Sequence, residues 1–589
     1  MPTNAEHSSS DPKGPLVRVQ PDQTGLAKTF DYAVPDEWAE RVAPGTMVRI
    51  VLGPRRVAAW VREVGVEPEA GVDPKPLTKI SGVGPSAEII ELADWARWRW
   101  AARTPVPFLR TASPPRMVAS LPAPGVRRHP VPPADDEVIQ GSFAGGPAVL
   151  RLPPTADDIP VVQAAVSLGD ALIVCASRGQ ASRVAARLVR AGVPTALHPD
   201  GWANAAAGGV TVVGTRASIW ASMPDLAAIV VFDEHDEVHQ EERTPTWHVR
   251  EVALERARRR GIPCVLTSPM PSLEALDAAR LVTIDRAAER DGWPKVVVAD
   301  RRDEDTARNA LFSPAFVRVA RSDERVVCVL NQKGGAVLLA CGSCRNLARC
   351  EACDAAVQRP GDDELVCRRC GATRPVVCAL CGSTGLKTVR MGVSRVSDDL
   401  EALAGEPVAV VTADDDAAVA DARLFVGTEA ALHRIDHADV VAFLDLDQEL
   451  LAPRHRAAEQ ALALLVRASR LVGGRHGTGR LLLQTRSPEH ETVQAALHGD
   501  PTPVTDAERL RRRDFRFPPE VAMAEVSGEA GAAFVGSLTA SPVLGIEVVG
   551  PVDGTWRITA PDHRTLCDAL DGVERPSGRL RLAVDPTRS

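Results

Sequence analysis

Eight cysteines within 41 residues, from Cys341 to Cys381, constrain the fold of this chain more than any other feature of its sequence. A C-x-x-C hairpin directs two thiolates to one point. Two such hairpins complete a tetrahedral S4 site of the kind that selects zinc or an iron–sulfur cluster. The cysteines form four such pairs: Cys341/Cys344, Cys350/Cys353, Cys367/Cys370 and Cys378/Cys381. We therefore predict two closed sites in which the metal is structural and not catalytic.

The spacing indicates which pairs share a metal. The inner pairs read C-x2-C-x13-C-x2-C, close to a zinc ribbon, and the outer pairs would close a second site around them. Sequential pairing is an alternative, although only five residues separate Cys344 from Cys350. Disulfides, redox dithiols and buried apolar cysteines are the other interpretations, and nothing in the chain indicates the secretion that favours disulfides. We predict two zinc ions per chain, with an iron–sulfur cluster as the alternative.

The charge balance limits the partners that the chain can have. Its 589 residues carry a net charge of −8, so any nucleic-acid contact must use local basic patches. No stretch approaches the ~18 apolar residues of a membrane span. The polar N-terminus also lacks an apolar signal core. We expect a cytoplasmic protein without a membrane partner.

Hydrophobic periodicity and turn residues divide the chain into parts. Two successive regions of strand–helix alternation predict tandem parallel α/β lobes, as in nucleic-acid-dependent motors, so the fold class is α/β. A helix over 86–101 carries three Trp that we expect in a core. The predicted parts are 1–14 (disordered tail), 15–112 (small β domain), 113–142 (Pro-rich linker), 143–290 (first helicase-like lobe), 291–504 (second lobe with the cysteine module 341–381 inserted) and 505–589 (C-terminal α+β domain).

Short motifs in a fixed order make the chain resemble PriA (primosomal protein N′), the family of bacterial replication-restart DNA helicases. Lys28-Thr29-Phe30-Asp31-Tyr32 is similar to the family's 3′-end-binding domain. Other motifs follow in the family's order: Val213-Gly214-Thr215-Arg216, Asp233-Glu234-His235-Asp236, Leu330-Asn331-Gln332-Lys333-Gly334, Arg456-Ala457-Ala458-Glu459 and Phe517-Pro518-Pro519. The resemblance implies forked DNA and single-stranded 3′ ends as ligands, and other primosome or helicase-loading proteins as partners. It also implies a winged helix, for which 113–142 leaves room only in vestigial form.

The nucleotide site is where the chain departs from that family. A phosphate loop, G-x-x-x-x-G-K-[ST], needs backbone N–H donors and a lysine, yet none of the seven lysines follows a glycine. The expected position, residues 153–158, reads PPTADD. Prolines lack the donors, and aspartates at a helix start would repel phosphate. We interpret Thr155 as the cap of a helix instead.

Two further sequence elements that ATP hydrolysis needs also differ from the family's pattern. Asp233 and Glu234 end a strand where a magnesium ion would sit, but without a phosphate loop the ion has nothing to bridge. The family's two arginine-finger positions fall on Leu471 and Gly474. We therefore assign no catalytic and no cofactor-binding residues, and predict a degenerate ATP-binding site.

Candidate DNA contacts remain in the β domain. By the resemblance, Phe30 and Asp31 would line a pocket for the terminal 3′ base, with Gly53 and Thr78 or Lys79 nearby. The alternative interpretation of this stretch is a β-turn with a buried Phe.

Two more candidates lie elsewhere in the chain. Thr215 and Arg216 follow a strand and could hold a phosphate, or could form a plain turn with a solvated Arg. The basic run 509–516 precedes Phe517 and suits a nucleic-acid strand, or else a solvated helix face.

Three functions compete at this point. The first is a DNA-binding primosome protein that recognises stalled or abandoned forks and directs replication restart without ATP hydrolysis. The second is an active ATP-dependent 3′→5′ DNA helicase with an atypical nucleotide site. The third is a zinc-dependent chaperone or thiol protein. The first is favoured, because the motif order supports the family while the ATP motifs fail together.

Overall fold

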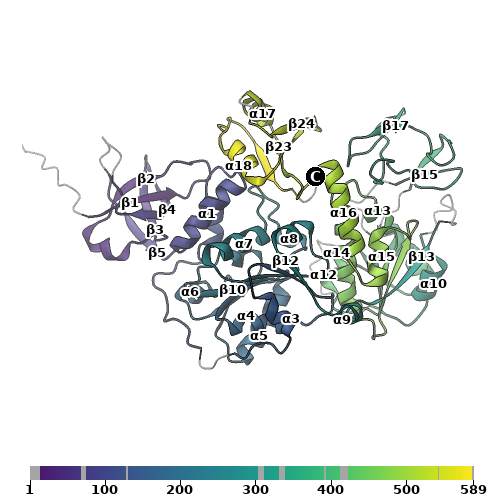
Figure 1. Cartoon of the computed structure of the whole chain (residues 1–589), viewed down its shortest axis with the longest axis horizontal. Coiled ribbons are helices and arrows are strands. Elements are labelled where there is room, and N and C mark those ends of the chain that lie inside the picture. The colour runs from purple at the N-terminus through teal and green to yellow at the C-terminus, as the bar shows by residue number, and fades with distance from the viewer. Residues whose placement is uncertain are drawn as a thin grey trace, which may run out of the picture. The chain divides into compact units, whose positions relative to one another are not determined.

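The chain folds as two compact units, each built from separate stretches of sequence (Figure 1). The first unit contains the described residues of 1–148, 158–266 and 521–586, and the second those of 149–157 and 267–520. Residues 149–157 and 267–290, which the sequence groups with the first lobe, thus lie in the second unit. The computed structural model describes residues 14–67, 74–127, 131–302, 311–330, 338–361, 363–389, 393–411, 422–540 and 543–586. The predicted tail up to residue 13 and Asn331–Gly334 of the family motif lie outside these ranges.

A small antiparallel β domain opens the first unit. Its elements are β1 (Leu16–Pro21), β2 (Phe30–Ala33), η1 (Asp36–Arg41), β3 (Met47–Leu52), β4 (Arg55–Val64) and β5 (Lys79–Gly82), with strand order β2-β1-β4-β3-β5. Strand alternation sends Val17, Val19, Val48 and Ile50 into a core where none is exposed. The outer edge of β2 is also paired, because the Ala33 N–H donates to the carbonyl of Lys75 (2.9 Å).

Two helices with an aromatic core follow the β domain. They are α1 (Ala87–Arg99) and α2 (Val106–Ala112). Trp100 is buried as expected, and Trp95 packs edge-on against it at 5.4 Å between ring centroids. Trp98 instead reaches the surface, where its Nε1–H donates to Asp568 (2.8 Å). Ring contacts continue from Phe108 to the fully buried Trp220 at 5.4 Å.

The stretch 113–142 is extended and held against neighbouring parts of the first unit. The Val118 carbonyl accepts from the Val83 N–H (2.8 Å), and the Gly125 N–H donates to the Gly208 carbonyl (2.9 Å). In the described part of this stretch the one helix is α3 (Glu137–Ser142), which is too short for a winged helix.

A seven-stranded sheet contains all five strands predicted for the first lobe, with two short ones that the pattern missed, β8 and β12. Parallel pairs join β10 to β7 and β11, and β9 to β7 and β8. The strands, in the order β12-β6-β11-β10-β7-β9-β8, are β6 (Ala148–Arg151), β7 (Asp170–Val174), β8 (Thr195–Leu197), β9 (Thr211–Gly214), β10 (Leu226–Val231), β11 (Cys264–Ser268) and β12 (Arg280–Thr283). The helices of this region are α4 (Ile159–Ser167), α5 (Arg178–Arg190), α6 (Trp202–Ala207), η2 (Arg216–Trp220), η3 (Glu237–His239), α7 (Val249–Arg260), α8 (Leu273–Ala278) and α9 (Arg286–Asp291).

A six-stranded sheet, parallel throughout, forms the centre of the second unit. Val327 and Val329 of β14 face one hydrophobic core, and Val326 and Cys328 face the other, so both faces are covered. The strands, in the order β13-β22-β21-β14-β20-β19, are β13 (Lys295–Asp300), β14 (Val326–Val329), β19 (Val408–Val411), β20 (Leu424–Gly427), β21 (Val440–Phe443) and β22 (Arg480–Thr485). The helices are α10 (Pro314–Ala320), α11 (Val393–Ala404), α12 (Ala431–Arg434), α13 (Asp447–Leu450), α14 (Ala457–Val472), α15 (Glu491–His498) and α16 (Thr502–Phe515).

A C-terminal α+β domain completes the first unit and docks on α1. Arg99 of α1 reaches Asp585 (2.7 Å), which also contacts His563 (2.9 Å). Although burial opposes it, the cationic surroundings hold the pKa of Asp585 well below its usual range. The elements are β23 (Ala522–Ser527), α17 (Gly531–Ala540), β24 (Glu547–Val552), β25 (Thr555–Ala560), α18 (His563–Asp571) and β26 (Arg581–Val584). The predicted fold class, two tandem α/β sheets flanked by a β domain and an α+β domain, is thereby confirmed.

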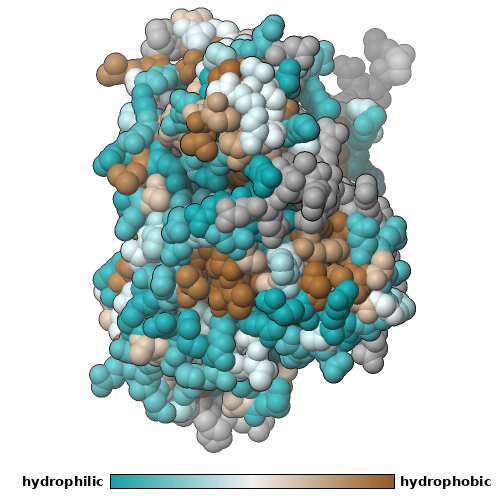
Figure 2. Space-filling view, turned by 90° about the vertical axis from the view of Figure 1, so that its right-hand side faces the viewer, coloured by the Kyte–Doolittle hydropathy of each residue, from teal (hydrophilic) through white to brown (hydrophobic). Residues whose placement is uncertain are grey.

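Apolar residues on the surface are scattered. Figure 2 shows one face of the molecule, on which hydrophobic residues form separate patches among hydrophilic ones. Within the part of the chain that is described, no helix is long and apolar enough to cross a membrane.

A buried arginine organises the second unit around α16. The Arg512 side chain has no exposed surface and contacts three carboxylates: those of Glu274 (2.9 Å), Glu508 (3.3 Å) and Glu459. It also donates to the carbonyl of Pro518 (3.0 Å). Burial alone would disfavour each of these charges, so the cluster is stable only as a complete set.

Replacing Arg512 with Met should destabilise the second unit by about 3–5 kcal/mol at neutral pH, because three buried carboxylates lose the cation they share, although Arg456 still contacts Glu274 and Arg511 still contacts Glu508. Burial already raises the pKa of Glu459, and loss of Arg512 raises it further. The folded variant therefore binds protons more readily than the unfolded chain, and the deficit should shrink as pH falls from 7.5 to 5. Urea unfolding at both pH values measures this. Arg513→Met, at a neighbouring position where the side chain is 64% exposed, serves as the control and should shift stability by under about 0.5 kcal/mol.

Candidate metal centres and nucleic-acid interface

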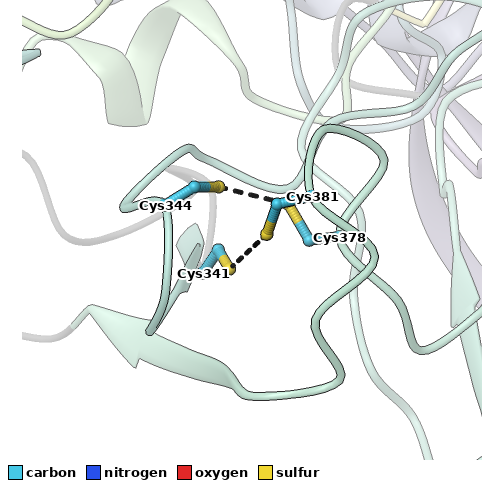
Figure 3. Close-up of side chains that lie close together, drawn as sticks. All are labelled: Cys341, Cys344, Cys378 and Cys381. Atoms are coloured by element: carbon cyan, nitrogen blue, oxygen red, sulfur yellow. Dashed lines mark hydrogen bonds between the residues drawn. The ribbon is translucent and has the colours of Figure 1, made fainter.

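The outer four cysteines converge on one point from two hairpins (Figure 3). The Sγ atoms of Cys341 and Cys381 are 3.6 Å apart, and those of Cys344 and Cys378 are 3.5 Å apart. A disulfide would need about 2.05 Å, whereas four sulfurs at about 2.3 Å from a tetrahedral metal lie about 3.8 Å from one another. The spacing fits a metal-binding tetrad and excludes disulfides here.

The inner four cysteines form a second tetrad of the same dimensions. Cys350 and Cys370 are 3.5 Å apart at Sγ, as are Cys353 and Cys367. This tetrad is the more buried of the two, since it packs among Leu339, Ala355, Val357 and Leu365. The predicted nested pairing is therefore confirmed, and the sequential alternative is excluded.

One backbone turn is repeated four times to build these sites. In every C-x-x-C pair, the N–H of the residue after the second cysteine donates to the carbonyl of the first cysteine at 2.9 Å. That residue adopts a left-handed φ in each copy, at Arg345 (64°), Asp354 (60°), Gly371 (79°) and Gly382 (72°). The turn aims both thiols of a pair at the same point. Two copies use a non-glycine residue there, so glycine spacing could not have revealed the repeat.

Hydrogen bonds favour the thiolate form of one cysteine in each tetrad. The backbone N–H of Cys344 lowers the pKa of Cys341 to about 6. The Cys353 side chain lowers the pKa of Cys367 to about 5. Other thiols of the same tetrads, those of Cys344 and Cys353, have raised pKa values, so a cation that binds four thiolates has to displace the remaining protons.

The cysteine module, residues 338–389, is attached to the second unit by hydrogen bonds. Its strands are β15 (Leu338–Cys341), β16 (Glu364–Val366), β17 (Thr373–Pro375) and β18 (Leu386–Val389). The Ala356 N–H donates to the Leu451 carbonyl (2.8 Å), and Arg369 donates to the carbonyls of Cys353 (3.1 Å) and Ala452 (2.8 Å). The module is thus anchored to the segment after α13. Each metal site has four cysteine side chains as its potential ligands.

Elemental analysis of the purified protein should find two metal ions per chain. Cys350→Ser should leave one, because a structural tetrahedral site needs all four ligands. Cys264→Ser is the matched control, since Cys264 is a buried cysteine outside both tetrads, and it should retain both ions. A single ion in the wild-type protein would contradict the two-site arrangement.

Phe30 and Asp31, the first two predicted DNA contacts, point to opposite sides of β2. Phe30 lies opposite Val19 and packs against the domain core, with the Lys28 ammonium 6.0 Å from its ring centroid. Asp31 lies opposite Arg18, whose guanidinium donates two hydrogen bonds to the carboxylate at 3.0 and 3.3 Å. The buried-Phe alternative thus describes Phe30, while Asp31 lies on the outer face.

The other predicted contacts of this domain, Gly53 and Lys79, flank strand β3. Gly53 forms the β3–β4 turn with a φ of 59°, and Lys79 begins β5 directly opposite Arg49. Thr78 is fixed by a hydrogen bond from its Oγ1 to the Arg49 carbonyl (2.9 Å).

Arg49, Arg56 and Lys79 form a basic outer face on the β domain. Arg49 pairs across from Lys79, and Arg56 lies opposite Val51, two residues along β3 from Arg49, so that all three share a face. They are exposed, and no described residue forms an ion pair with them. Like charges directly opposite in a sheet are destabilising, and a bound anion would offset that repulsion. In the sequence, Arg49 alternates with the apolar residues Val48 and Ile50, and this strand pattern was the signal that could have identified the face.

Thr215 and Arg216 form the turn after β9, as predicted, but the guanidinium of Arg216 is engaged within the protein. It donates to the carbonyls of Val238 (3.0 Å) and Gln240 (2.5 Å) and pairs with Glu241 (2.9 Å). A phosphate contact by Arg216 would have to share or displace these partners.

The basic run 509–516 fits neither sequence interpretation as a whole, that is, neither a binding site for a nucleic-acid strand nor a solvated helix face. Arg512 lies at the centre of the buried cluster described above. Arg511 pairs with Glu508 (2.6 Å) and Glu491 (2.5 Å). Phe517 is buried and stacked on His455 at 5.2 Å between ring centroids. Both sequence interpretations were incomplete, because neither allowed for burial of charge.

Protein contacts fill the position that a phosphate loop would occupy. Helix α4 begins at Ile159 with Asp158 as its N-cap, so Thr155 is not the cap as predicted. The Thr155 hydroxyl instead donates to the Gly292 carbonyl (2.9 Å). Pro153 packs so closely on Gly292 that a β-carbon there would lie 2.4 Å from its Cγ.

The arginine-finger segment contacts the same turn. Arg470 Nε donates to the Pro154 carbonyl (3.1 Å), and Arg475 Nε donates to the Arg290 carbonyl (3.5 Å). Leu471, at the first finger position, is buried in the core of the second unit. The basic side chains that flank the finger positions are therefore used for internal contacts.

The acidic pair after β10 is buried. Asp233 is held in a left-handed conformation (φ 53°), and Glu234 has no exposed surface. The Arg250 guanidinium donates to Glu234 (3.0 Å), and His248 caps the start of α7 through the Arg250 N–H (3.0 Å). Glu234 is thus part of a buried ion pair, an arrangement that does not leave it free to activate water.

The two tandem sheets, the module with two thiolate tetrads and the β domain with a basic face fit a protein that binds metal ions and a polyanion. Residues 17–112 match the family model for the PriA 3′DNA-binding domain. The chain is 30% identical to the probable replication restart protein PriA of Mycobacterium leprae, over 94% of this chain and 91% of that protein. It therefore belongs to the PriA family of replication restart proteins, as the motif order predicted.

Two further relatives are also replication restart proteins. The replication restart protein PriA of Bacillus subtilis is 27% identical over 58% of this chain and 47% of its own length. That of Haemophilus influenzae is 24% identical over 62% of this chain and 54% of its own length. A solved DEAD box protein from Methanococcus jannaschii matches 64% of this chain and 91% of its own, at 10% identity and a TM-score of 0.31.

Proposed function

We propose that this protein recognises stalled or abandoned replication forks by their 3′ ends and directs replication restart without hydrolysing ATP. The relationship to replication restart proteins along almost the whole chain supports the first part. The observation that carries the second part is the Pro153–Thr155 turn, where a prolyl carbonyl and a threonyl hydroxyl bond to Arg470 and Gly292.

Chemistry at the γ-phosphate needs positioning and charge neutralisation, supplied by a loop lysine, Mg²⁺ and an arginine finger. In this chain the loop has prolines and aspartates, Glu234 is committed to Arg250, and Leu471 stands at a finger position. An arginine finger alone accounts for about 10³–10⁵ in rate. With all three parts changed together, the described residues at these three positions supply neither a phosphate cradle nor a charge for the γ-phosphate.

The protein would then act as a scaffold that recruits other primosome or helicase-loading proteins to the fork. Its metal ions are proposed to be zinc, because a closed tetrahedral set of four thiolates suits structural zinc. When bound, zinc supplies folding energy to the module and no reaction chemistry. Since the chromosome is its site of action, we propose a cytoplasmic location.

Two other functions make different demands. An active 3′→5′ helicase would need a nucleotide site built from other residues, and would show fork-stimulated ATPase activity. A thiol protein would need reactive cysteines outside the tetrads. The remaining four, Cys175, Cys264, Cys328 and Cys567, are all buried, and burial raises their thiol pKa values, so they are poor nucleophiles.

Calorimetric titration with a non-hydrolysable ATP analogue should give no heat of binding, with or without forked DNA. The ATPase rate should equal that of a buffer blank in both conditions, because no phosphate cradle is present. A DNA-stimulated ATPase of known activity is the positive control for reagents and DNA. Fork-stimulated hydrolysis that disappears in Asp233→Ala would refute the proposal and establish the helicase alternative.

Asp31→Ala should weaken the preference for a free 3′-hydroxyl end over a 3′-blocked end of the same oligonucleotide. The reason is that Asp31 lies on the outer face of the domain that matches the family's 3′DNA-binding model. Glu63→Ala is the matched control, since Glu63 also contacts Arg18 (3.6 Å) but is 57% exposed and outside the proposed pocket. The control should keep the preference. Equal weakening on both oligonucleotides would indicate misfolding and count against a 3′-end pocket at Asp31.

A further inference from the structure

The two thiolate tetrads have the same dimensions but differ in how far solvent reaches their sulfurs. Three inner cysteines, Cys350, Cys353 and Cys367, are 5%, 6% and 0% exposed and belong to a hydrophobic cluster. In the outer tetrad Cys381 is exposed and Cys344 is partly exposed. Two sites with the same ligand set are therefore open to different reagents.

The hairpin that carries Cys381 lies at the surface of the cysteine module. Both residues between its cysteines are exposed, Leu380 to 70%. Gly382 turns the chain back directly after the hairpin, with a φ of 72°. Cys381 shares this surface position, while Cys378 at the other end of the hairpin stays buried.

A second cysteine is held beside Cys381 by contacts that do not depend on the metal (Figure 3). The Sγ atoms of Cys341 and Cys381 are 3.6 Å apart. Cys341 ends β15, which pairs antiparallel with β18, and the Gly342 N–H donates to the Gly385 carbonyl (2.8 Å). These backbone contacts bring the chain that follows Cys381 back to Cys341, so the two sulfurs stay neighbours.

We propose that Cys381 is a modification site at which a hydroperoxide oxidises the outer tetrad and releases its metal, while the inner tetrad keeps its own. This inference rests on the proposed zinc ions and goes beyond their structural role. A ligand cysteine is a thiolate, and oxidation favours a thiolate that is accessible and lies beside a second cysteine. Cys381 is exposed and has Cys341 as that neighbour.

The reaction takes two electrons from two thiolates. The Cys381 sulfur attacks one oxygen of hydrogen peroxide, the O–O bond breaks, and a sulfenic acid forms as hydroxide leaves. The Cys341 thiolate then attacks that sulfur, the S–O bond breaks, and a disulfide forms as a second hydroxide leaves. Two protons convert the two hydroxides to water, so one peroxide is reduced for each disulfide formed.

This disulfide removes two of the four ligands. The remaining two, Cys344 and Cys378, are too few for a closed tetrahedral site. The contacts of the module with the segment after α13 come from Ala356 and Arg369, which lie in its inner half, so the module stays attached. The step is a modification and not a catalytic cycle, because it ends when these ligands are used.

The inner tetrad is protected in two respects. None of its four members is exposed, since even Cys370 is only partly so. Cys370 also packs, together with Phe515, against the hydrophobic cluster that contains the other three inner cysteines. Peroxide therefore reaches the inner sulfurs more slowly, and the two ions should leave in separate phases.

The test follows metal release from the full-length protein after elemental analysis has found two zinc ions in it. The probe is hydrogen peroxide, and a chromogenic zinc chelator reports each ion as it leaves. One ion per chain should appear in a first phase, and the second only in a later phase or after denaturation. Release of both ions in one phase would overturn the inference, as would no release under conditions that oxidise free cysteine completely.

Peptide mapping identifies the bond that forms. Trypsin leaves Cys341 in the peptide 334–345 and Cys381 in the peptide 370–387, since it does not cut before Pro375. After the first phase, mass spectrometry without reduction should find these two peptides joined, with fragment ions that locate the bond at Cys341 and Cys381. A new disulfide inside either peptide would show this pairing to be wrong.

Two histidine variants separate oxidation from metal binding. Cys381→His keeps four zinc ligands and removes the oxidisable sulfur, so it should hold two ions and lose the first phase. Cys370→His is the matched change in the inner tetrad and should hold two ions and keep that phase. A first phase at the wild-type rate in Cys381→His would overturn the proposal. If this variant holds a single ion, wild-type release and the peptide map decide.

The outcomes also separate this inference from the proposed function. A single ion, or iron, in the untreated protein would contradict the proposed zinc sites before any oxidation. Binding of a 3′-ended oligonucleotide by the untreated protein tests DNA recognition independently, because residues 17–112 contain no cysteine. Two zinc ions that leave together from a protein that binds this oligonucleotide would refute the inference alone.

Discussion

Parallel strands have to be covered on both faces, and this requirement determines where every other feature of the molecule can lie. In the second unit, alternate residues of β14 enter two separate hydrophobic cores, so neither sheet face is available for a ligand. Only the segments after the strands remain. Thr215 follows β9, Asp233 follows β10, and the cysteine module comes after β14. Each of these segments can vary in sequence without changing the residues that face the sheet cores, because it begins where its strand ends.

The features that could be predicted from the sequence are those fixed by local spacing. The nested tetrads followed from C-x-x-C pairs, and most strands of both sheets followed from apolar runs bounded by turns. The strands β8 and β12 were missed because three or four residues, such as Thr195–Leu197, give too short a pattern. The six-residue strand β13 (Lys295–Asp300) was missed as well. The roles of Thr155 and Arg512 could not be predicted, because their partners Gly292 and Glu274 are more than 100 residues away. Arg216 was placed correctly in its turn, but its partners at 238–241 come from a separate loop.

The contrast between paired and unpaired arginines is informative about function. Arg512 and Arg256 are buried and surrounded by carboxylates or carbonyls, as burial of a charge requires. Arg49 and Lys79 on the β domain face one another, although the chain has more acidic than basic residues from which partners could have come. A surface that keeps like charges adjacent gives up some folding stability, and selection for binding polyanions accounts for that loss.

Asp585 has a consequence for how the protein is made. The carboxylate that Arg99 contacts is 486 residues further along the chain, so helix α1 cannot reach its final environment until Asp585 has been synthesised. At about 5–20 residues per second, synthesis of that interval takes about 25–100 s. During this time Arg99 of α1 has no Asp585 to contact. The first unit can therefore be completed only after residue 585 has been made, and a chain truncated before Asp585 lacks this contact.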